Sequence, residues 1–531
     1  MDRPVIISFA LSLLLFACSS MQKGGVAGRE LSPYDFGLSS AKNGIDRYNV
    51  IYKTHSAAIA AGVSVSYKGI TSLDLEVPPN AKSIPLSMKN DFNGVSFNVE
   101  NSQKDFFLFE YQLKAAVITV SKRDIDKGSF INYPVLARGR HLLVISDNNP
   151  WVGQREGYSY GHTRKDILLL NNGKSLNKTV MPYDNEGSSP SCKYYSLPQG
   201  PMQIKGLTLN RTKTSRKRTY LCSIQGMDDV QLSSITINTP PNMGQDDMAI
   251  RINDCTNVVF EDVSINGTYS RTDHSGYGVS MNNIWNFRVS RMVGKGDWGI
   301  FGTNNINNAS FEGSEINRFD VHCYGRDISF NNVVFRDKYN QFASVYGTIR
   351  FDKCTFISFC PVLNGTSYNA YVGFDLIMNN CVFNATKGKT ILIDEGCLDN
   401  TINSRKELAE RCLPNVTINN LTVNLADDVT DVYLFYFRTK DSFKRDFGYL
   451  DNISVSDIKF KYQSGRAPGN FYLSNVKLSF RRAVQSNMDG IDIIGNTNLN
   501  KSNRGRVVRN MEFKSNKSIL KVGRVKARSI E

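Results

Sequence analysis

The densest group of residues able to carry out acid–base chemistry lies in one short stretch, residues 317–327. If this stretch is a strand, Arg318, Asp320 and His322 project from one face, while Phe319 and Val321 project from the other. A carboxylate can orient an imidazole, an imidazole titrates near neutral pH, and a guanidinium can neutralise an acidic substrate. We therefore expect an outward-facing Arg-Asp-His triplet, backed by an apolar inner face, at the centre of the functional site.

Further candidates lie near this triplet and would join it if neighbouring turns of the chain are stacked. Trp298 offers an aromatic surface on which a sugar ring can pack. The alternative is a surface ladder of salt bridges with a solvated histidine. Besides the triplet, the predicted catalytic residues are Tyr324, Lys295 and Asp297, and the predicted substrate-binding residues are Trp298, Arg326, Tyr277, Asp246, Asp247 and His274.

The elements that would position these residues are short alternating runs separated by polar turns. Nine runs begin at successive spacings of 28, 29, 22, 19, 21, 27, 40 and 37 residues. Alternation with period two places half of each run in a core, and recurrence over tens of residues is typical of a solenoid. We predict an all-β, right-handed, single-stranded parallel β-helix with an N-terminal cap and side insertions. The runs begin at Val230, Val258, Phe287, Ala309, Ile328, Ile349, Leu376, Val416 and Ile453.

Repeated Asn doublets mark the corners of these units, at 282–283, 304–305, 331–332, 379–380 and 419–420. They are expected to stack into a side-chain ladder, although Asn also tolerates the turn conformation without stacking. Cys255, Cys354 and Cys381 lie in or beside strand-like runs and are predicted to be small core residues. An antiparallel sandwich is the structural alternative, but hairpin signals between the runs are scarce.

The chain divides into five predicted parts. Residues 1–17 are a signal peptide, 18–105 a tether and cap, and 106–200 an early coil with an insertion. Residues 201–498 form the β-helix, and 499–531 a basic tail. Within the second part, Asp35-Phe-Gly37 followed by Ala57-Ala-Ile-Ala-Ala-Gly62 resembles an amphipathic helix that opens many β-helices.

Cys18 ends an apolar stretch, Leu15-Phe-Ala-Cys-Ser-Ser20, which resembles the lipobox of bacterial lipoproteins. The stretch is too short to span a bilayer, so it is predicted to be removed, leaving a lipidated Cys18. Ser19 and Ser20 resemble the pattern that sorts lipoproteins to the outer membrane. An ordinary secretory signal is the alternative.

The distribution of charge indicates which molecules the protein could bind. The chain carries a net charge of +15, of which residues 499–531 contribute +8, and a second basic cluster lies at 211–218. Such clusters could bind acidic glycans or phosphates, whereas nucleic acid is a poor fit for an exported lipoprotein. The alternative is that these charges are simply solvated and bind no partner.

Cys397 and Cys412 flank a 14-residue charged insert and are predicted to form a disulfide. No His/Cys cluster has zinc spacing.

One segment resembles a known family. Asn238-Thr-Pro-Pro-Asn242, Asp246-Asp247-Met-Ala-Ile250 and Asn257-Val258 are similar to the sequence around the first catalytic Asp of polygalacturonases. The coils resemble the pectate-lyase-like superfamily, which includes polysaccharide lyases, polygalacturonase-like hydrolases and phage tailspike proteins. The Gly-Asp-Asp, Gly-His-Gly and Arg-Ile-Lys motifs of polygalacturonases are absent downstream, so the resemblance implies the fold more than the reaction.

Two functions follow as hypotheses. In the first, an outer-membrane lipoprotein cleaves an acidic polysaccharide, either as a lyase or as a hydrolase that uses two carboxylates. In the lyase version, His322 or Lys295 takes a proton, Arg318 or Arg326 neutralises a uronate, and Tyr324 or Tyr277 protonates the leaving oxygen. In the second, a non-catalytic surface lipoprotein binds glycan or acts in adhesion. The sequence leaves open a role for Ca²⁺ and the oligomeric state.

Overall fold

The computed structural model describes most of the chain between residues 30 and 528. The described residues are 30–100, 105–110, 115–152, 162–180, 190–198, 200–212, 219–239, 247–267, 277–296, 299–343, 345–358, 360–364, 373–386, 388–395, 415–437, 453–462, 470–474, 485–494, 519–522 and 525–528.

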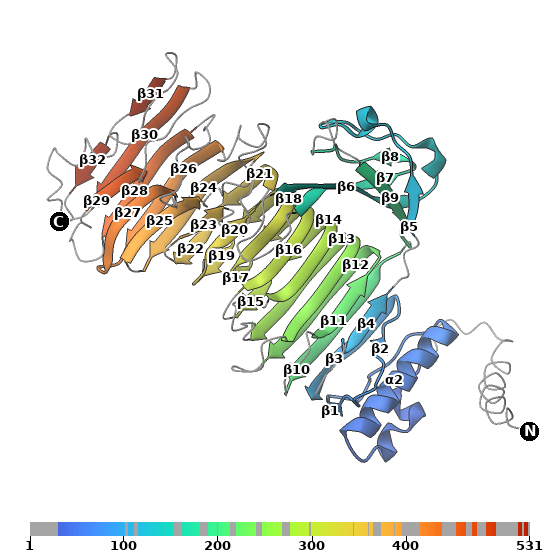
Figure 1. Cartoon of the computed structure of the whole chain (residues 1–531). Coiled ribbons are helices and arrows are strands. Elements are labelled where there is room, and N and C mark those ends of the chain that lie inside the picture. Colours follow the sequence, from blue (N-terminus) through green and yellow to red (C-terminus); the bar gives the residue numbers. More distant parts are fainter. Residues whose placement is uncertain are drawn as a thin grey trace, which may run out of the picture.

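A helical cap closes the N-terminal end of the described chain. Two short 3₁₀ helices, η1 (Pro33–Phe36) and η2 (Leu38–Ser40), precede α2 (Gly44–Ala61). The side chain of Asn43 accepts a hydrogen bond from the Asp46 N–H at 2.8 Å, and Gly62 ends the helix in the left-handed conformation. Tyr48, Ile51 and Ala58 of α2 are buried in the main core, as the expected opening helix requires. Figure 1 shows α2 beside the first strands, of which it contacts β1 (Ser72–Glu76) and β2 (Ile84–Pro85).

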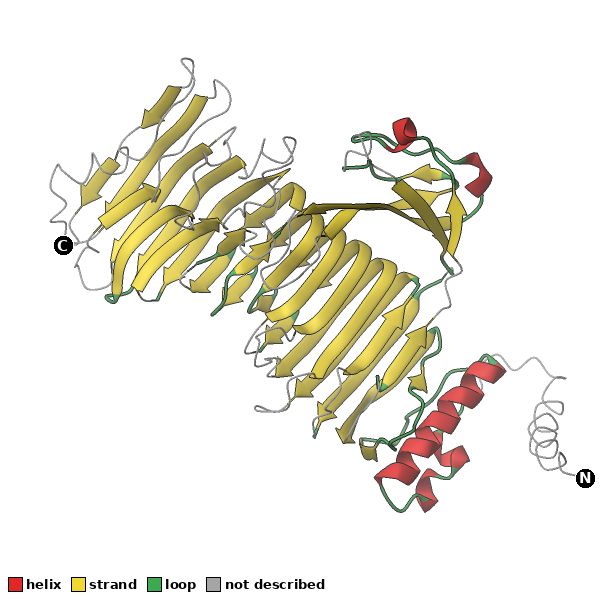
Figure 2. Ribbon diagram, viewed as in Figure 1, coloured by secondary structure: helices red, strands yellow, loops and turns green. Residues whose placement is uncertain are grey.

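The body is a parallel β-helix, as the sequence predicts, and the antiparallel alternative is wrong for it. Every pairing given for its described strands is parallel (Figure 2). The strands are β1 (Ser72–Glu76), β2 (Ile84–Pro85), β3 (Lys89–Glu100), β4 (Phe107–Glu110), β10 (Met202–Arg211), β11 (Thr219–Gln225), β12 (Asp228–Thr239), β13 (Asp247–Gly267), β14 (Tyr277–Ser290), β15 (Val293–Lys295), β16 (Gly299–Glu312), β17 (Glu315–Ile316), β18 (Phe319–Asn331), β19 (Val334–Arg336), β20 (Asn340–Phe342), β21 (Val345–Asp352), β22 (Thr355–Ser358), β23 (Val362–Asn364), β24 (Gly373–Ala385), β25 (Gly388–Glu395), β26 (Asn415–Leu425), β27 (Val429–Phe437), β28 (Ile453–Tyr462), β29 (Asn470–Ser474), β30 (Gln485–Ile494), β31 (Ile519–Val522) and β32 (Val525–Arg528).

The register confirms the predicted repeat residue by residue. The first residues of all nine alternating runs are paired in one column, from Val230 through Val258 and Phe287 to Ile453. Hydrophobic alternation and strand register therefore have the same origin, because a slip of one residue would turn every apolar side chain outward.

The Asn corners both stack and adopt the turn conformation. Asn305 donates to Asn283 at 3.0 Å, and Asn283 donates to Asp254 at 2.7 Å. Asn283, Asn305 and Asn420 also have positive φ angles, near 55°. The two explanations thus hold together for Asn283 and Asn305, since each adopts the turn conformation and its amide donates to the preceding coil. The doublet at 331–332 departs from the predicted ladder, because Asn331 donates to Glu312 instead of to an Asn.

The core between the coils is apolar and rich in stacked aromatic rings. Phe311, Phe330 and Phe351 lie in register, and successive ring centroids are 4.9 and 5.0 Å apart. The cysteines at 255, 354 and 381 are buried in the same core, as predicted. Burial of one such Phe contributes about 1.5–3 kcal/mol, so the stack stabilises the coils that carry the site.

The insertion forms a separate antiparallel sheet on the side of the solenoid (Figure 1). It comprises β5 (Ala115–Ile118), η3 (Lys122–Ile125), η4 (Pro134–Leu136), β6 (Arg140–Val152), β7 (His162–Asn171), β8 (Lys174–Ser175) and β9 (Pro190–Ser196). β7 lies against β14, β16 and β18. Within the described part of the chain, no helix combines the length and the apolar character that a membrane span needs.

Candidate functional site

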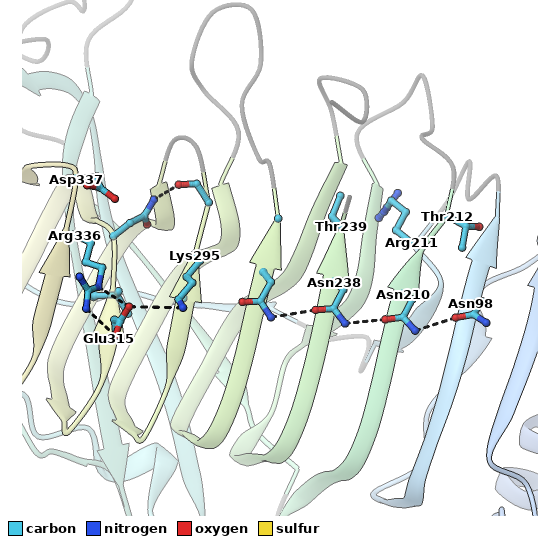
Figure 3. Close-up of a pocket in the computed structure, with 16 residues that line it drawn as sticks. Asn98, Asn210, Arg211, Thr212, Asn238, Thr239, Lys295, Glu315, Arg336 and Asp337 are labelled. Carbon is cyan, nitrogen blue, oxygen red and sulfur yellow. Dashed lines mark hydrogen bonds and ion pairs between the residues drawn. The ribbon is translucent and has the colours of Figure 1, made fainter. Parts of the chain in front are cut away.

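A groove of about 810 Å³ runs across seven successive coils, where the strands end in a corner (Figure 3). We call it the axial groove. Its lining comes from the ends of β3, β10, β12, β13, β15, β17 and β19 and from the residues that follow them. The lining residues are Asn98, Asn210, Arg211, Thr212, Asn238, Thr239, Asn266, Gly267, Gly294, Lys295, Gly296, Glu315, Ile316, Asn317, Arg336 and Asp337.

Half of the groove floor is a ladder of amides. Asn210 donates to Asn98 at 2.9 Å, Asn238 donates to Asn210 at 2.8 Å, and Asn266 donates to Asn238 at 3.1 Å. The four side chains share one register position on parallel strands, so they repeat at the usual strand spacing of about 4.8 Å. The ladder therefore presents one amide to each coil.

The other half of the groove is charged. Lys295 continues the asparagine column, because it pairs with Asn266. Its Nζ lies 3.9 Å from Oε1 of Glu315, and Nε of Arg336 donates to the same oxygen at 2.6 Å. Lys295 remains 61% exposed and Arg336 45% exposed, so both cations face solvent in the groove.

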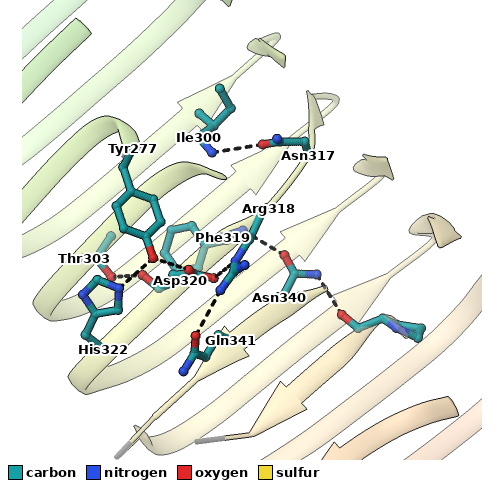
Figure 4. A network of polar contacts seen from close by, with 11 residues as sticks. Tyr277, Ile300, Thr303, Asn317, Arg318, Phe319, Asp320, His322, Asn340 and Gln341 are labelled. Carbon is teal, nitrogen blue, oxygen red and sulfur yellow. Dashed lines mark hydrogen bonds and ion pairs between the residues drawn. The ribbon is translucent and has the colours of Figure 1, made fainter. Parts of the chain in front are cut away.

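A polar network lies directly around the corner from this charged half (Figure 4). Asn317 lines the groove, and the next residue, Arg318, begins the network. The Tyr277 hydroxyl donates to Oδ2 of Asp320 at 2.6 Å and lies 2.8 Å from Nε2 of His322. We call Tyr277, Arg318, Asp320 and His322 the Tyr277 network.

A β-bulge places His322 in this network. Thr303 pairs with Val321, but the next residue, Asn304, pairs with Cys323, so His322 is the extra residue on β18. A bulge bends the strand and re-aims the side chain of its extra residue. Alternation alone does not set the direction of His322, because the register shifts at this position.

Burial and pairing set the charges of the network. Nε of Arg318 donates to Oδ1 of Asp320 at 2.5 Å, and its Nη2 donates to Gln341 at 3.0 Å. Burial raises the pKa of Asp320 above its ordinary value, while the charge of Arg318 and the hydrogen bond from Tyr277 oppose that shift. Burial tends to lower the pKa of Arg318, but attraction to Asp320 outweighs it and raises the pKa. Arg318 is therefore a permanent cation.

The predicted exposure of the triplet is wrong for two of its three members. Phe319 and Val321 do face the core, as alternation requires. Arg318 and Asp320 lie on the opposite face, yet their side chains are only 1% and 0% exposed. The reason is that two tyrosine rings cover them: Tyr277, from the β14 coil, crosses the intervening coil to reach Asp320, and the centre of the Tyr339 ring lies 4.4 Å from the guanidinium carbon of Arg318. Arg318 and Asp320 thus position other groups, and His322 remains partly exposed.

Two other predicted site residues are turned toward the insertion. The Tyr324 hydroxyl donates to the backbone oxygen of Thr163, and Nη1 of Arg326 donates to that of Lys178 at 2.5 Å. Tyr324 is buried, which raises its pKa well above the ordinary value. These contacts fasten the insertion to β18 and do not bring either side chain to His322.

The remaining predicted residues are only partly visible in the structure. Asp247 begins β13, but its side chain is not among those described. Asp246, His274, Asp297 and Trp298 lie outside the described residues, as do Cys18, Cys397 and Cys412. Among the residues that the structure describes, no group of three or more His, Cys, Asp or Glu side chains could hold a metal ion.

Sequence reasoning missed most of the axial groove. Of its charged residues, Lys295 is a predicted site residue and Arg211 belongs to the predicted basic cluster, but Glu315, Arg336 and the asparagine ladder were not predicted. A usable signal was present, because each ladder Asn follows a hydroxyl residue by two positions at a strand end. The four repeats are Ser96-Phe-Asn98, Thr208-Leu-Asn210, Thr236-Ile-Asn238 and Ser264-Ile-Asn266.

Comparison with known proteins yields only structural likenesses. No family model matches the chain, and no curated protein does. Tailspike gp49 of Pseudomonas phage LKA1 is 11% identical, over 94% of this chain and 83% of that one, with a TM-score of 0.49. Tailspike gp61 of Pseudomonas phage phi297 is 13% identical, over 87% and 84%, with a TM-score of 0.48. The gp54 tailspike of Acinetobacter baumannii bacteriophage AP22, solved in complex with A. baumannii capsular saccharide, is 11% identical over 84% and 77%, with a TM-score of 0.43. The chain is thus similar in structure to phage tailspike proteins, and the likeness assigns no role to any of its residues.

Proposed function

We propose that the protein binds a linear, acidic polysaccharide that lies in the axial groove along the solenoid axis. The observation that carries this proposal is the amide ladder, which offers Asn98, Asn210, Asn238 and Asn266 at one-coil intervals. Seven coils at the usual strand spacing cover roughly 29 Å from the first to the last. The advance per coil is close to the length of one sugar unit, so each coil can meet one unit.

The lining of the groove suits a polysaccharide whose hydroxyl groups lie along the amide ladder and whose negative charge lies at the charged half. An Asn side chain has two N–H donors and two acceptor positions, and the ladder uses one of each on Asn238. On Asn238 the second donor and the second acceptor position can therefore serve one sugar hydroxyl. Asn210 and Asn266 give their second N–H to the hydroxyls of Ser96 and Ser264, so these two amides offer a sugar an acceptor position. Lys295 and Arg336 at the charged half favour a carboxylate over a neutral unit.

The test is glycan binding by a ladder variant and a matched control. Asn238→Leu removes one amide from the groove floor. Asn424 stacks on Asn384 at 2.7 Å and belongs to the same register column but lies beyond the groove, so Asn424→Leu is the control. With a panel of uronate-containing polysaccharides, Asn238→Leu should weaken binding roughly tenfold, the equivalent of about one hydrogen bond. Equal affinities for the two variants would refute the groove assignment.

Cleavage of a polysaccharide at the Tyr277 network, which lies outside the lining of the axial groove, is a second candidate function. It is favoured by the contact between the Tyr277 hydroxyl and Nε2 of His322, a pair able to move a proton. In a lyase reaction, His322 would take the C5 proton of a uronate and Tyr277 would protonate the leaving oxygen. The test is absorbance of unsaturated products: activity that His322→Gln abolishes supports the lyase, and a protein that binds without any product is a binder only.

The proposed location is the outer membrane, through acyl chains on Cys18. The support is the Leu15-Phe-Ala-Cys-Ser-Ser20 sequence alone. Two or more acyl chains give the stable attachment that a single chain does not. Metabolic labelling with a fatty acid tests this, and label that persists in Cys18→Ala would contradict it.

A further inference from the structure

The outer edge of the insertion carries exposed apolar side chains among cations. Of the large hydrophobic residues that are exposed in the described chain, Phe130 (60%), Val135 (81%) and Leu176 (50%) all lie here. Residues 121–140 and 171–180 contain seven Lys or Arg and two Asp, which gives this edge a net charge of +5. This edge includes η3, η4 and β8, and Figure 1 shows the two short helices on the side of the insertion that is turned away from the solenoid. At the other end of the edge, the backbone oxygen of Lys178 accepts the hydrogen bond from Arg326 of β18.

Backbone pairing gathers Phe130 and Leu176 on one face, and Val135 lies in the neighbouring η4. Asn132 forms an antiparallel bridge with Lys174, and the backbone N–H of Ser175 donates to the oxygen of Ile131 at 2.9 Å. Ile131 and Ser175 face inward and are buried. Residues directly opposite each other on paired strands point to the same face, and successive residues of one strand point to opposite faces. The outward face therefore holds Phe130, Asn132, Lys174 and Leu176.

A cation lies over the central aromatic ring of this face. Nζ of Lys178 is 5.2 Å from the centre of the Phe130 ring. Lys174 and Lys178 are both exposed, and Lys127 lies beside them, because Gly128 bonds Thr179 through the backbone at 2.9 Å. We call Lys127, Phe130, Val135, Lys174, Leu176 and Lys178 the insertion tip.

We propose that the insertion tip binds the surface of an anionic phospholipid membrane. Apolar side chains that can enter the headgroup region, surrounded by Lys that can pair with phosphates, are the combination such surfaces attract. A glycan would use the aromatic ring and the cations but would leave Leu176 and Val135 against water. The positive charge also disfavours a second copy of the same tip, since two equal patches would repel each other.

The tip and the axial groove are built from different parts of the chain. No residue of the tip lines the groove, and the tip belongs to the insertion while the groove belongs to the coils. This inference is therefore independent of glycan binding, and a variant of the tip should bind polysaccharide as the unaltered protein does.

The test uses residues 19–531, which contain every described element but lack the proposed acyl anchor. Co-sedimentation with vesicles of phosphatidylcholine and phosphatidylglycerol is compared with vesicles of phosphatidylcholine alone. The charge variant is Lys174→Gln with Lys178→Gln, and the apolar variant is Phe130→Ser with Leu176→Ser. The controls are Lys205→Gln with Lys353→Gln on the solenoid, and Tyr34→Ser with Ile59→Ser, the exposed apolar residues of the cap.

The protein and both control variants should co-sediment with the anionic vesicles and should not co-sediment with the neutral ones. The charge variant should partition roughly 30-fold less, since each Lys near an anionic surface contributes about 1 kcal/mol. The apolar variant should lose at least about tenfold. Equal binding by the tip variants and their controls would overturn the proposal. The proposal would also be overturned if the tip variants lost self-association or polysaccharide binding but still bound the vesicles.

Discussion

The ring of Tyr277 lies directly over Gly302, and a Cβ atom placed on Gly302 would be only 2.5 Å from Cδ2 of that ring. Gly302 sits on β16, between the Tyr277 coil and the Asp320 coil. The absence of a side chain there lets the phenol cross one coil and reach Asp320 and His322. A glycine on one coil therefore makes a contact between its two neighbours possible.

Gly302→Ala should displace Tyr277 and break its hydrogen bond to Asp320. We expect a loss of about 1–3 kcal/mol in the free energy of unfolding, the usual effect of overpacking, together with the loss of any cleavage activity. The control is Gly302→Ala in a Tyr277→Ala background, where the added methyl has room. If the glycine substitution costs as much in that background, the steric explanation is wrong.

Asp320→Ala should destabilise the solenoid strongly. It leaves the guanidinium of Arg318, whose side chain is 1% exposed, without its carboxylate, and loss of one member of a buried pair costs about 3–5 kcal/mol. Asp262→Ala is the matched control, because Asp262 also pairs with an Arg, Nε of Arg291 at 2.7 Å, but both side chains are about half exposed. Denaturant titration should separate the two variants widely; similar curves would contradict the buried pair.

His322→Gln should leave the stability nearly unchanged while it removes cleavage, if the protein cleaves its polysaccharide. His322 is partly exposed at a bulge, so its side chain contributes less packing than Asp320. The pair of measurements is the thermal midpoint and the rate of product formation. A variant with full activity would exclude His322 as the base, and one that unfolds would show that it is structural.

The cap should lose stability as the pH falls. His55 in α2 is fully buried, and this burial lowers its pKa from 6.5 to about 4. The folded state therefore resists protonation while the unfolded state accepts it, so the stability from neutral His55 is complete above pH 6.5 and is lost progressively down to pH 4. The loss is about 3 kcal/mol in total. Hydrogen exchange of the α2 amides should show it, and His55→Leu should flatten the pH dependence; an equal slope in both proteins would contradict it.

The sequence was sufficient for the coil architecture but not for the burial of the site. Alternating runs identified the register from Val230 to Ile453, because the same periodicity sets both the core and the strand pairing. It could not show that Arg318 and Asp320 are covered, since the cover comes from other coils. Tyr277, 41 and 43 positions earlier in the chain, reaches Asp320 across a glycine on the intervening coil, and the ring of Tyr339 lies over the guanidinium of Arg318. It also could not show that Tyr324 and Arg326 hold the insertion, because that docking depends on contacts between distant segments.

The measurement that tests the central claim most directly is the affinity of the protein for acidic oligosaccharides of increasing length. If the polysaccharide lies along the axial groove, affinity should rise with each added unit until the chain spans the seven coils, roughly 29 Å, and then level off. The rise should be smaller in Asn238→Leu than in Asn424→Leu. An affinity already complete for a disaccharide, or a length dependence unchanged by Asn238→Leu, would contradict the account.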